Sequence, residues 1–285
     1  MQINFNRVYA DYQLGPIRSK NVVDGISLEL AKNTFTAVVG HTGAGKSSLL
    51  KLLNGLLLPT DGEVSVGDLT IDKNGKKKTL NKVRKRVGMV FQFPERQLFA
   101  ETVEQDIAFG PKNFGFSKEE ITQLVDQSLK QVGLTPDILP KSPFSLSGGQ
   151  KRRVAIAGII ATKPDVLVLD EPGAGLDPEG KQEILAMLRT LHDTHDSTTI
   201  LVTHDMNDVV TYCDNVLVME KGQVTTHQTV RGLFSNQNEI DRLGIGLPEP
   251  LRLQRLIEEH TGRVFPHVCL TQQELKDQLL EGAHL

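Results

Sequence analysis

The 285-residue sequence has little cysteine and no excess of positive charge. Its two cysteines, Cys213 and Cys269, lie far apart and have no metal-ligand spacing around them, so they favour a reducing compartment over a disulfide scaffold. Lysine and arginine number 32 against 35 acidic residues, which gives a formal net charge of -3. Overall charge therefore gives no support for a nucleic-acid partner.

A long hydrophobic run is also missing. No apolar stretch approaches the ~18–20 residues that a membrane-spanning helix needs, and the N-terminal MQINFNRVYADY lacks the apolar core of a signal peptide. We therefore expect a soluble chain. Its 285 residues, 39% of them hydrophobic, can bury one sizeable core and predict one main domain with a small C-terminal addition. Such a chain could still lie at a membrane through a partner.

The sequence does contain a series of short apolar runs that alternate with helical patterns. Continuous runs of this length are typical of strands buried on both faces, so they predict a mostly parallel sheet covered by helices, an α/β fold. The runs are FTAVV (35–39), DVLVLD (165–170), TTILVTH (198–204) and NVLVME (215–220).

Two other regions carry helix signals. SKEEITQLVDQSLKQVGL opens with a capping box of Ser117 and Glu120, and it predicts an amphipathic helix that stops at Gly133. Near the C-terminus, GLPEPLRLQRLIEEHTG and LTQQELKDQLLEGAHL predict two short amphipathic helices, the second opened by a capping box of Thr271 and Glu274.

The segment from 60 to 80 has turn residues instead. Asp61-Gly62 and Asn74-Gly75 predict turns between short antiparallel strands. The KKK at 76–78 is expected to form the solvated tip of a hairpin.

A glycine-rich stretch, GHTGAGKSS, lies between FTAVV and a helical pattern and matches G-x-x-x-x-G-K-[ST]. Glycines let backbone N–H groups and a helix N-terminus converge on phosphate oxygens. The lysine is expected to reach the β- and γ-phosphates of a nucleotide, and the serine after it to ligate Mg²⁺. The predicted ATP-binding residues here are Gly40, His41, Thr42, Gly43, Ala44, Gly45, Lys46, Ser47 and Ser48.

A second motif completes a nucleotide site. The run VLVLDEP ends in Asp170 and Glu171. The first carboxylate can hold Mg²⁺ through water, and the second can polarise an attacking water. Together with the glycine-rich loop, this pair predicts a nucleoside triphosphatase.

The stretch LSGGQKRRVAIAGIIA, residues 146–161, precedes VLVLDEP and resembles the signature sequence of ABC-type ATPases. Further motifs of that family occur in order. Gln92 in MVFQFP resembles the Q-loop glutamine, Asp177 in AGLDP the D-loop aspartate, and His204 in LVTHD the switch histidine.

The resemblance covers about residues 1–230 and implies a P-loop ABC nucleotide-binding domain with a mostly parallel sheet core, an antiparallel β subdomain and a helical subdomain at about 93–162. Residues 231–285 are expected to form a helical C-terminal extension that holds two ATPases together. Tyr12 in VYADY resembles the aromatic residue that stacks on adenine, with Tyr9 as the competing candidate.

The same resemblance implies a head-to-tail dimer in which each chain completes the ATP site of the other. Glu171 would activate water, and His204 would sense or stabilise the γ-phosphate. Mg²⁺ would be bound by Ser47, Gln92 and Asp170. The residues expected to act on the partner's ATP are Ser147, Gly148, Gly149 and Gln150, next to Asp177 of the D-loop.

Within the ABC family, FQFPERQLFAETVEQDIAFGPKNFG (91–115) and GLPEPLRLQRL resemble the ATPases of energy-coupling factor (ECF) importers, in particular the second of their two EcfA- and CbiO-like ATP-binding proteins. This implies import of vitamins or transition-metal ions at the cytoplasmic face of the cell membrane. The implied partners are a second homologous ATPase, a transmembrane coupling protein (T component) and a small substrate-binding membrane protein (S component).

Two alternatives remain open at this point, namely the ATPase of a conventional ABC importer and a soluble regulatory ABC ATPase without transport. One departure from the family pattern stands out. The sequence EPGAGLDP has Gly173 where relatives commonly carry threonine, which predicts altered flexibility of the loop.

Overall fold

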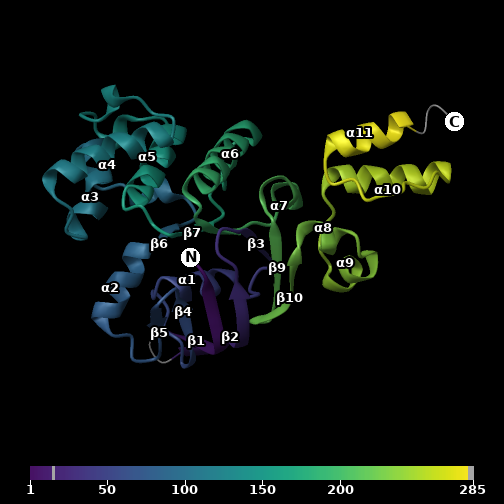
Figure 1. Ribbon diagram of the computed structural model, residues 1–285, viewed down its shortest axis with the longest axis horizontal. Coiled ribbons are helices and arrows are strands. Elements are labelled where there is room, and N and C mark those ends of the chain that lie inside the picture. Colours follow the sequence, from purple (N-terminus) through teal and green to yellow (C-terminus); the bar gives the residue numbers. More distant parts are fainter. Residues whose placement is uncertain (15–16, 282–285) are drawn as a thin grey trace.

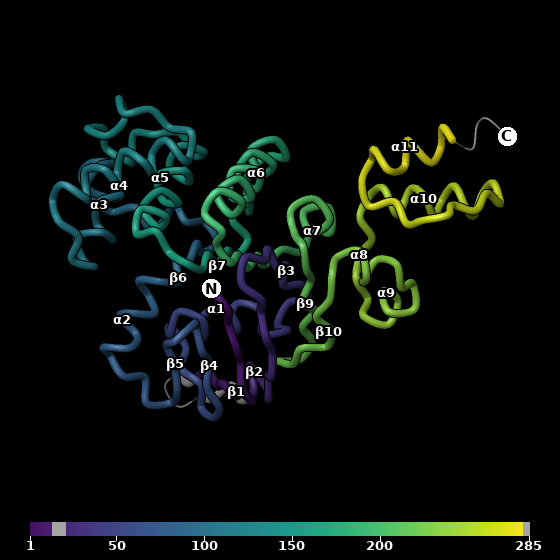
Figure 2. The backbone as a smooth tube through the Cα atoms, in the orientation of Figure 1, coloured from purple at the N-terminus to yellow at the C-terminus, as the bar shows by residue number. Residues whose placement is uncertain are grey.

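The computed structural model describes residues 1–14 and 17–281 of the chain. Figure 1 shows two sheets at the centre, helices α3 to α5 grouped on one side and the C-terminal helices on the other. The tube in Figure 2 shows the N-terminus at the centre of the molecule and the described chain ending in the C-terminal helices on the side opposite α3 to α5. In the described part of the chain, no helix is long and apolar enough to cross a bilayer.

The larger sheet has six strands in the order β10-β9-β3-β8-β7-β6. All neighbouring pairs from β9 to β6 are parallel, and only the edge strand β10 is antiparallel. This confirms the predicted sheet and adds β6 and β10 to the four expected strands. The strands are β3 (Phe35–Val39), β6 (Val87–Val90), β7 (Val166–Asp170), β8 (Thr198–Val202), β9 (Asn215–Glu220) and β10 (Gln223–Thr229).

The continuous apolar runs are explained by packing on both faces of this sheet. Along β7, Val166 and Val168 belong to a core shared with the smaller sheet, while Leu167 and Leu169 belong to a core shared with the helices on the opposite face. Successive side chains of a strand point to opposite faces, so a strand covered on both sides needs apolar residues at every position.

The smaller sheet is antiparallel, in the order β2-β1-β4-β5, and packs over α1, the helix that follows the glycine-rich loop. The apolar face of this sheet, with Ile3, Phe5 and Val64 among its fully or nearly fully buried residues, forms one core with the leucines of α1. The elements are β1 (Ile3–Leu14), β2 (Ile17–Leu30), β4 (Asp61–Val66), β5 (Leu69–Ile71) and α1 (Lys46–Leu53).

The prediction of a hairpin around residues 60–80 is wrong in two details. Asp61 and Gly62 begin β4, and the chain reverses between β4 and β5 after Val66. The predicted lysine-rich hairpin tip is the start of a helix, α2 (Lys77–Arg86). Its Val83 is fully buried, and Arg84 donates hydrogen bonds to the carbonyl oxygens of Asn54 and Gly55 at the end of α1. These contacts give α2 a docking site that a solvated tip would lack.

A group of helices covers the face of the six-stranded sheet opposite the smaller sheet. The capping box predicted at the start of one of them, α4, is confirmed. Ser117 Oγ accepts from Glu120 N at 3.2 Å, and Glu120 Oε2 accepts from Ser117 N at 2.7 Å. The elements of this group are η1 (Pro94–Gln97), α3 (Val103–Asn113), α4 (Lys118–Gln131), η2 (Pro136–Ile138), η3 (Pro143–Ser145) and α5 (Gly148–Ile160).

Two more helices, α6 (Pro178–His195) and α7 (Met206–Tyr212), follow the strands β7 and β8. The chain then ends in α8 (Val230–Phe234), α9 (Gln237–Leu243), α10 (Glu249–Thr261) and α11 (Gln272–Glu281). The capping box expected before α11 is present, since Thr271 Oγ1 accepts from Glu274 N at 3.1 Å and Glu274 Oε2 accepts from Thr271 N at 3.4 Å. Both cysteines are free.

Candidate active site

The glycine-rich loop is shaped by contacts that exclude side chains. Gly40 and Gly45 have φ angles of 146° and 100°. A Cβ at Gly40 would lie 2.2 Å from the carbonyl oxygen of Met219, and one at Gly45 would lie 2.5 Å from that of Val22. Only glycine fits such close approaches in the left-handed region. The loop, which follows β3, therefore packs closely against the backbone of β9 and β2.

The loop leaves the start of α1 open to a ligand. Gly45 is its N-cap and provides no side-chain hydrogen bond to the first N–H groups of the helix. These groups and the helix dipole favour an anion at this position. Exposed side chains of His41, Thr42 and Ser47 border the loop, whereas Ala44 and Ser48 point into the interior.

Lys46 bends back over the loop. Its Nζ donates to the carbonyl oxygens of Gly40 at 2.7 Å and His41 at 3.0 Å. Burial lowers the pKa of Lys46, although the carboxylates of Glu171 and Asp170 act in the opposite direction. The ammonium group is thus held at the loop, close enough to the acidic pair to interact with both members.

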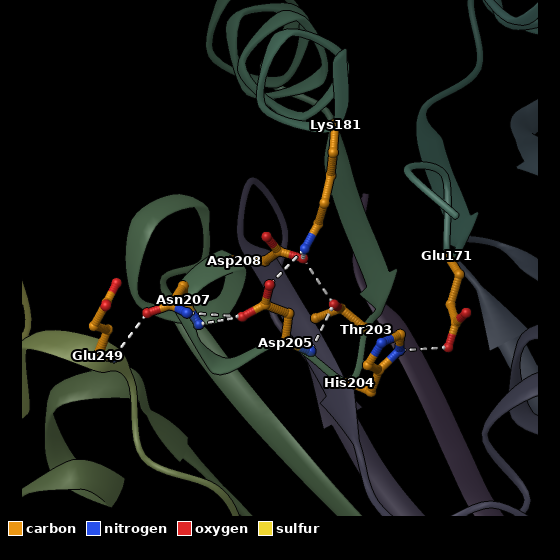
Figure 3. Close-up of polar contacts among 8 residues, drawn as sticks. All are labelled: Glu171, Lys181, Thr203, His204, Asp205, Asn207, Asp208 and Glu249. Carbon is orange, nitrogen blue, oxygen red and sulfur yellow. Dashed lines mark hydrogen bonds and ion pairs between the residues drawn. The ribbon is translucent and has the colours of Figure 1, made fainter. Parts of the chain in front are cut away.

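Glu171 lies between the predicted Q-loop and switch residues. Its Oε2 accepts from Gln92 Nε2 at 3.1 Å, and its Oε1 lies 3.1 Å from His204 Nδ1 (Figure 3). Its backbone has a φ of 49°, and its N–H donates to the carbonyl oxygen of Val202 at 3.1 Å. A left-handed backbone at a residue other than glycine costs free energy and is often found at functional sites.

Asp170 provides the second carboxylate. Burial raises its pKa, the hydroxyl of Ser47 lowers it through a hydrogen bond, and the charge of Glu171 raises it further. A cation beside Asp170 would stabilise its ionised form. A hydroxyl and a carboxylate oxygen are ligands that Mg²⁺ prefers, so these residues fit the predicted metal.

The two tyrosine candidates have different surroundings. Tyr12 lies beside α1, where its hydroxyl is 3.4 Å from Ser48 Oγ and its ring centroid is 5.3 Å from Lys51 Nζ. Tyr9 lies against β2, since a Cβ on Gly25 would meet its hydroxyl at 3.0 Å. Tyr12 is therefore the tyrosine that borders the glycine-rich loop and its helix.

The signature residues lie apart from this cluster, at the start of α5. Ser147 Oγ accepts from Gln150 N at 3.3 Å, and Gln150 Oε1 accepts from Ser147 N at 3.1 Å, which forms a capping box. A Cβ at Gly148 or Gly149 would have no neighbour within 4 Å in the described ranges 1–14 and 17–281. Asp177 is likewise an N-cap, accepting from Gly180 N at 2.8 Å at the start of α6. Among the described residues, no hydrogen bond joins the signature to the glycine-rich loop.

A buried arginine that the sequence analysis did not single out joins three of these segments. Arg152 in α5 forms a two-pronged ion pair with Glu95, with distances of 3.0 and 2.9 Å. Its third nitrogen donates to the carbonyl oxygens of Pro172 at 3.1 Å and Ala174 at 2.8 Å. The sequence signal for such a role is weak: Arg152 lies two residues before the apolar run VAIAGII, where a helix turns towards the core and a buried guanidinium needs acceptors.

Comparisons with known proteins agree with this geometry. A family model described as ABC transporter matches residues 23–174. The energy-coupling factor transporter ATP-binding protein EcfA2 of Geobacillus kaustophilus is 45% identical over 279 residues, covering 98% of this chain and 96% of the relative. The EcfA2 protein of Bacillus licheniformis is 46% identical with the same two coverages.

Solved structures give the same result. The cbiO1 protein of Clostridium perfringens, part of the ABC transporter complex cbiONQ, matches with a TM-score of 0.73 and 36% identity over 90% of this chain and 98% of that one. An ATP-binding cassette dimer in a post-hydrolysis state, bound to ADP and Pi, matches with a TM-score of 0.71 and 26% identity over 81% of this chain and 99% of that one.

The glycine-rich loop, the acidic pair after β7 and the capped glycine helix α5 together define a P-loop ATPase of the ABC class. Within that class, the chain belongs to the ATP-binding proteins of energy-coupling factor transporters. The family and fold predicted from the sequence are therefore confirmed, and the comparisons favour this family over a conventional importer ATPase or a soluble regulator.

Proposed function

We propose that this chain is the ATP-hydrolysing subunit of an ECF importer for vitamins or transition-metal ions. The observation that carries the proposal is the position of Glu171, held between Gln92 and His204 beside the glycine-rich loop. An importer ATPase needs a carboxylate that can be placed next to a terminal phosphate and released from it in a cycle.

The residues of this chain divide the chemistry between them. Lys46 and the free N–H groups of α1 bind the phosphates of ATP. Glu171 takes a proton from the attacking water. The oxygen of that water bonds to the γ-phosphorus as the bond between this phosphorus and the bridging oxygen of ADP breaks. His204 and Gln92 fix the direction of the Glu171 carboxylate.

Mg²⁺ would be held by Ser47 and Asp170, with the amide oxygen of Gln92 as a further ligand. When bound, it neutralises charge on the β- and γ-phosphates. Tyr12 is proposed to stack on adenine, because it borders α1 where Tyr9 does not.

The open start of α5 supports pairing with a second ATPase of the same family. The small size of Gly148 and Gly149 is not required by any neighbour in the part of their own chain that the structure describes. We propose that they leave room for the ATP held by the partner, with Ser147 Oγ and the α5 N-terminus directed at its γ-phosphate. Asp177 would lie at the same interface.

The membrane-facing surface is proposed to lie on α3 and the segment before it. Phe99 and Phe109 are 59% and 49% exposed and stack edge to face, with ring centroids 4.8 Å apart. Two large exposed aromatic rings in contact favour a protein partner. We propose the T component as this partner and peripheral attachment of the chain to the cytoplasmic face of the membrane, with an S component capturing the substrate.

The C-terminal helices are proposed to help hold the two ATPases together. An open groove between α10 and α11 is lined mainly by Pro250, Leu253, Leu275, Leu279 and Leu280. The side chains of Leu253 and Leu280 are half exposed. We place the boundary of this extension at about residue 231, where α8 has just begun.

Co-purification tests the proposal. The full chain carrying Glu171→Gln would be isolated with ATP from solubilised membranes of its own cells, and its partners identified by mass spectrometry. We expect a second ATPase, one coupling protein and one or more small membrane proteins. A pair of conventional permeases, or soluble partners alone, would contradict it.

A further inference from the structure

The positively charged side chain of Lys181 lies near the start of α6, where positive charge is unfavourable. Lys181 is in the first turn of this helix, where the helix dipole disfavours positive charge. Its Nζ contacts Asp205 Oδ2 at 2.6 Å and Asp208 Oδ2 at 2.8 Å (Figure 3). Burial would lower the pKa of Lys181, but these two hydrogen bonds outweigh it and the net shift is upward.

Both acceptors belong to the segment that carries His204. Asp205 Oδ1 caps α7 by accepting from Asn207 N at 2.9 Å. Thr203 Oγ1 accepts from Asp205 N at 3.1 Å and donates to Asp208 Oδ2 at 2.9 Å. The residues on either side of His204 are therefore fixed in one network, and Lys181 is its only cation among the described residues that Figure 3 draws.

His204 itself has little other support. Its side chain is 80% exposed, and within the described part of the chain the one hydrogen bond of its ring joins it to Glu171. A cavity of about 210 Å³ lies between the loop after Glu171 and the Thr203–His204 segment, so the two are not packed against each other throughout. An exposed ring that is not held by packing takes its direction from the backbone that bears it.

Gly173 lies beside the stem of Lys181. A Cβ at Gly173 would be 2.6 Å from Lys181 Cγ and 3.4 Å from Lys181 Cβ. Because Nζ is tied to two carboxylates, a side chain at Gly173 would press on a stem whose far end is already fixed. The glycine that departs from the family pattern is thus matched to the path of this lysine.

We propose that Lys181 is a positioning residue for ATP hydrolysis, which holds Asp205 and Asp208 so that His204 points at Glu171, and that Gly173 provides the space for it. The inference rests on the proposed role of His204. Lys181 does not touch the reacting atoms. Its effect passes through the backbone around His204.

The test compares Lys181→Met with Arg189→Met in the complex purified through this chain. Arg189 is a matched control, because it lies on the same helix, is similarly exposed and pairs with Asp193 and Asp214 away from His204. We expect Lys181→Met to lower kcat about tenfold with KM for ATP within about twofold of wild type. Arg189→Met should leave kcat within about twofold, with a similar loss of thermal stability.

Two further variants separate positioning from folding. Lys181→Arg keeps a cation that can donate to both Asp205 and Asp208, so this variant should stay within about threefold of the wild-type kcat. Gly173→Thr should lower kcat about as much as Lys181→Met, and the double variant should cost no more than either single one, because both remove the same interaction. Additive losses would overturn the pairing of Gly173 with Lys181.

His204→Ala, measured alongside, separates the two proposals. If His204→Ala hydrolyses ATP normally, the proposed role of His204 fails and this inference fails with it. If His204→Ala is inactive while Lys181→Met keeps the kcat of Arg189→Met, only the inference about Lys181 fails. If ATP binding and melting temperature fall in proportion to kcat in Lys181→Met, the lysine is structural and the inference is also wrong.

Discussion

The N-termini of α1 and α5 both combine glycine with serine, but they differ in whether neighbouring residues of the same chain require those glycines. At α1, Gly45 cannot carry a side chain, and no side chain caps the helix. At α5, Ser147 and Gln150 cap each other, and Gly149 has open space around it. The α1 glycines are required by the fold, and the α5 glycines are not.

This difference separates the two halves of the proposed ATP site. The α1 half is assembled within one chain, together with Lys46, Asp170 and Glu171. The α5 half has its internal hydrogen bonds satisfied and presents bare backbone outward. Small residues that no described neighbour requires leave room for a group from outside the chain, and this supports the proposal that the partner's nucleotide approaches there.

The largest effect is expected in the α1 half, from Glu171→Gln. The substitution keeps the shape of the side chain but removes the general base, which contributes about 10²- to 10⁴-fold to such reactions. We expect ATP hydrolysis by the purified complex to fall by that factor, with ATP binding retained. Glu63→Gln, on the exposed part of β4, is the control. Wild-type turnover in Glu171→Gln would rule out Glu171 as the base.

The next effect contrasts the two sets of glycines directly. Gly45→Ala places a Cβ against the Val22 carbonyl in a left-handed backbone, so we expect a loss of stability of about 2–4 kcal/mol, measured by denaturant unfolding. Gly149→Ala should leave stability unchanged or higher, because alanine favours a helix by about 0.5–1 kcal/mol over glycine.

Substitution of Gly149, although harmless to stability, should lower ATP hydrolysis. Gly149→Asp adds a carboxylate facing the proposed phosphate and should reduce hydrolysis in the paired ATPases at least about tenfold, with Gly149→Ala costing less. Binding of ATP to the variant chain itself should not change. Equal activity of Gly149→Asp and wild type would mean that the open space at α5 serves no nucleotide.

The motifs and strands of both halves could be predicted from the sequence, but the contacts between residues distant in sequence could not. The strands at 35–39 and 166–170 were clear because burial on both faces demands continuous apolar runs, and the glycine-rich loop has a spacing that few unrelated turns share. The lysine-rich start of α2 was mistaken for a turn, because its support comes from Asn54 and Gly55, which are distant in sequence. The partners of Arg152 and Lys181 are also distant in sequence, and local patterns cannot reveal such pairs.

Arg152 is the residue that connects α5 to the α1 half within one chain, through its bonds to Glu95 and to the loop after Glu171. Its side chain is 3% exposed and pairs with Glu95, which is 23% exposed. Arg152→Met would leave Glu95 and two carbonyl oxygens without their donor, and we expect a loss of about 2–3 kcal/mol in the free energy of unfolding. Hydrolysis should fall as well, because Pro172 follows Glu171 directly.

Arg153 is the neighbouring control for that prediction. It pairs with Glu183, which is 58% exposed, and donates one hydrogen bond to the carbonyl oxygen of Val132 at 2.8 Å, so Arg153→Met should cost less than Arg152→Met, about 1 kcal/mol. A double variant of Arg152→Met with Glu95→Gln should be less harmful than the sum of the two single changes. Equal costs for Arg152→Met and Arg153→Met would show that the buried pair does not stabilise the fold.

The smallest effect is expected at Tyr12, at the edge of the α1 half. Stacking of a base on an aromatic ring is worth about 1–3 kcal/mol, so Tyr12→Ala should weaken ATP binding at least about fivefold, measured by equilibrium titration. Tyr12→Phe should bind nearly as tightly, because the ring remains and the contact of the hydroxyl with Ser48 is long, at 3.4 Å. Tyr9→Ala is the matched control. If it weakens binding more than Tyr12→Ala without loss of stability, adenine lies over β2, and the α1 half of the site extends in a different direction from the one proposed.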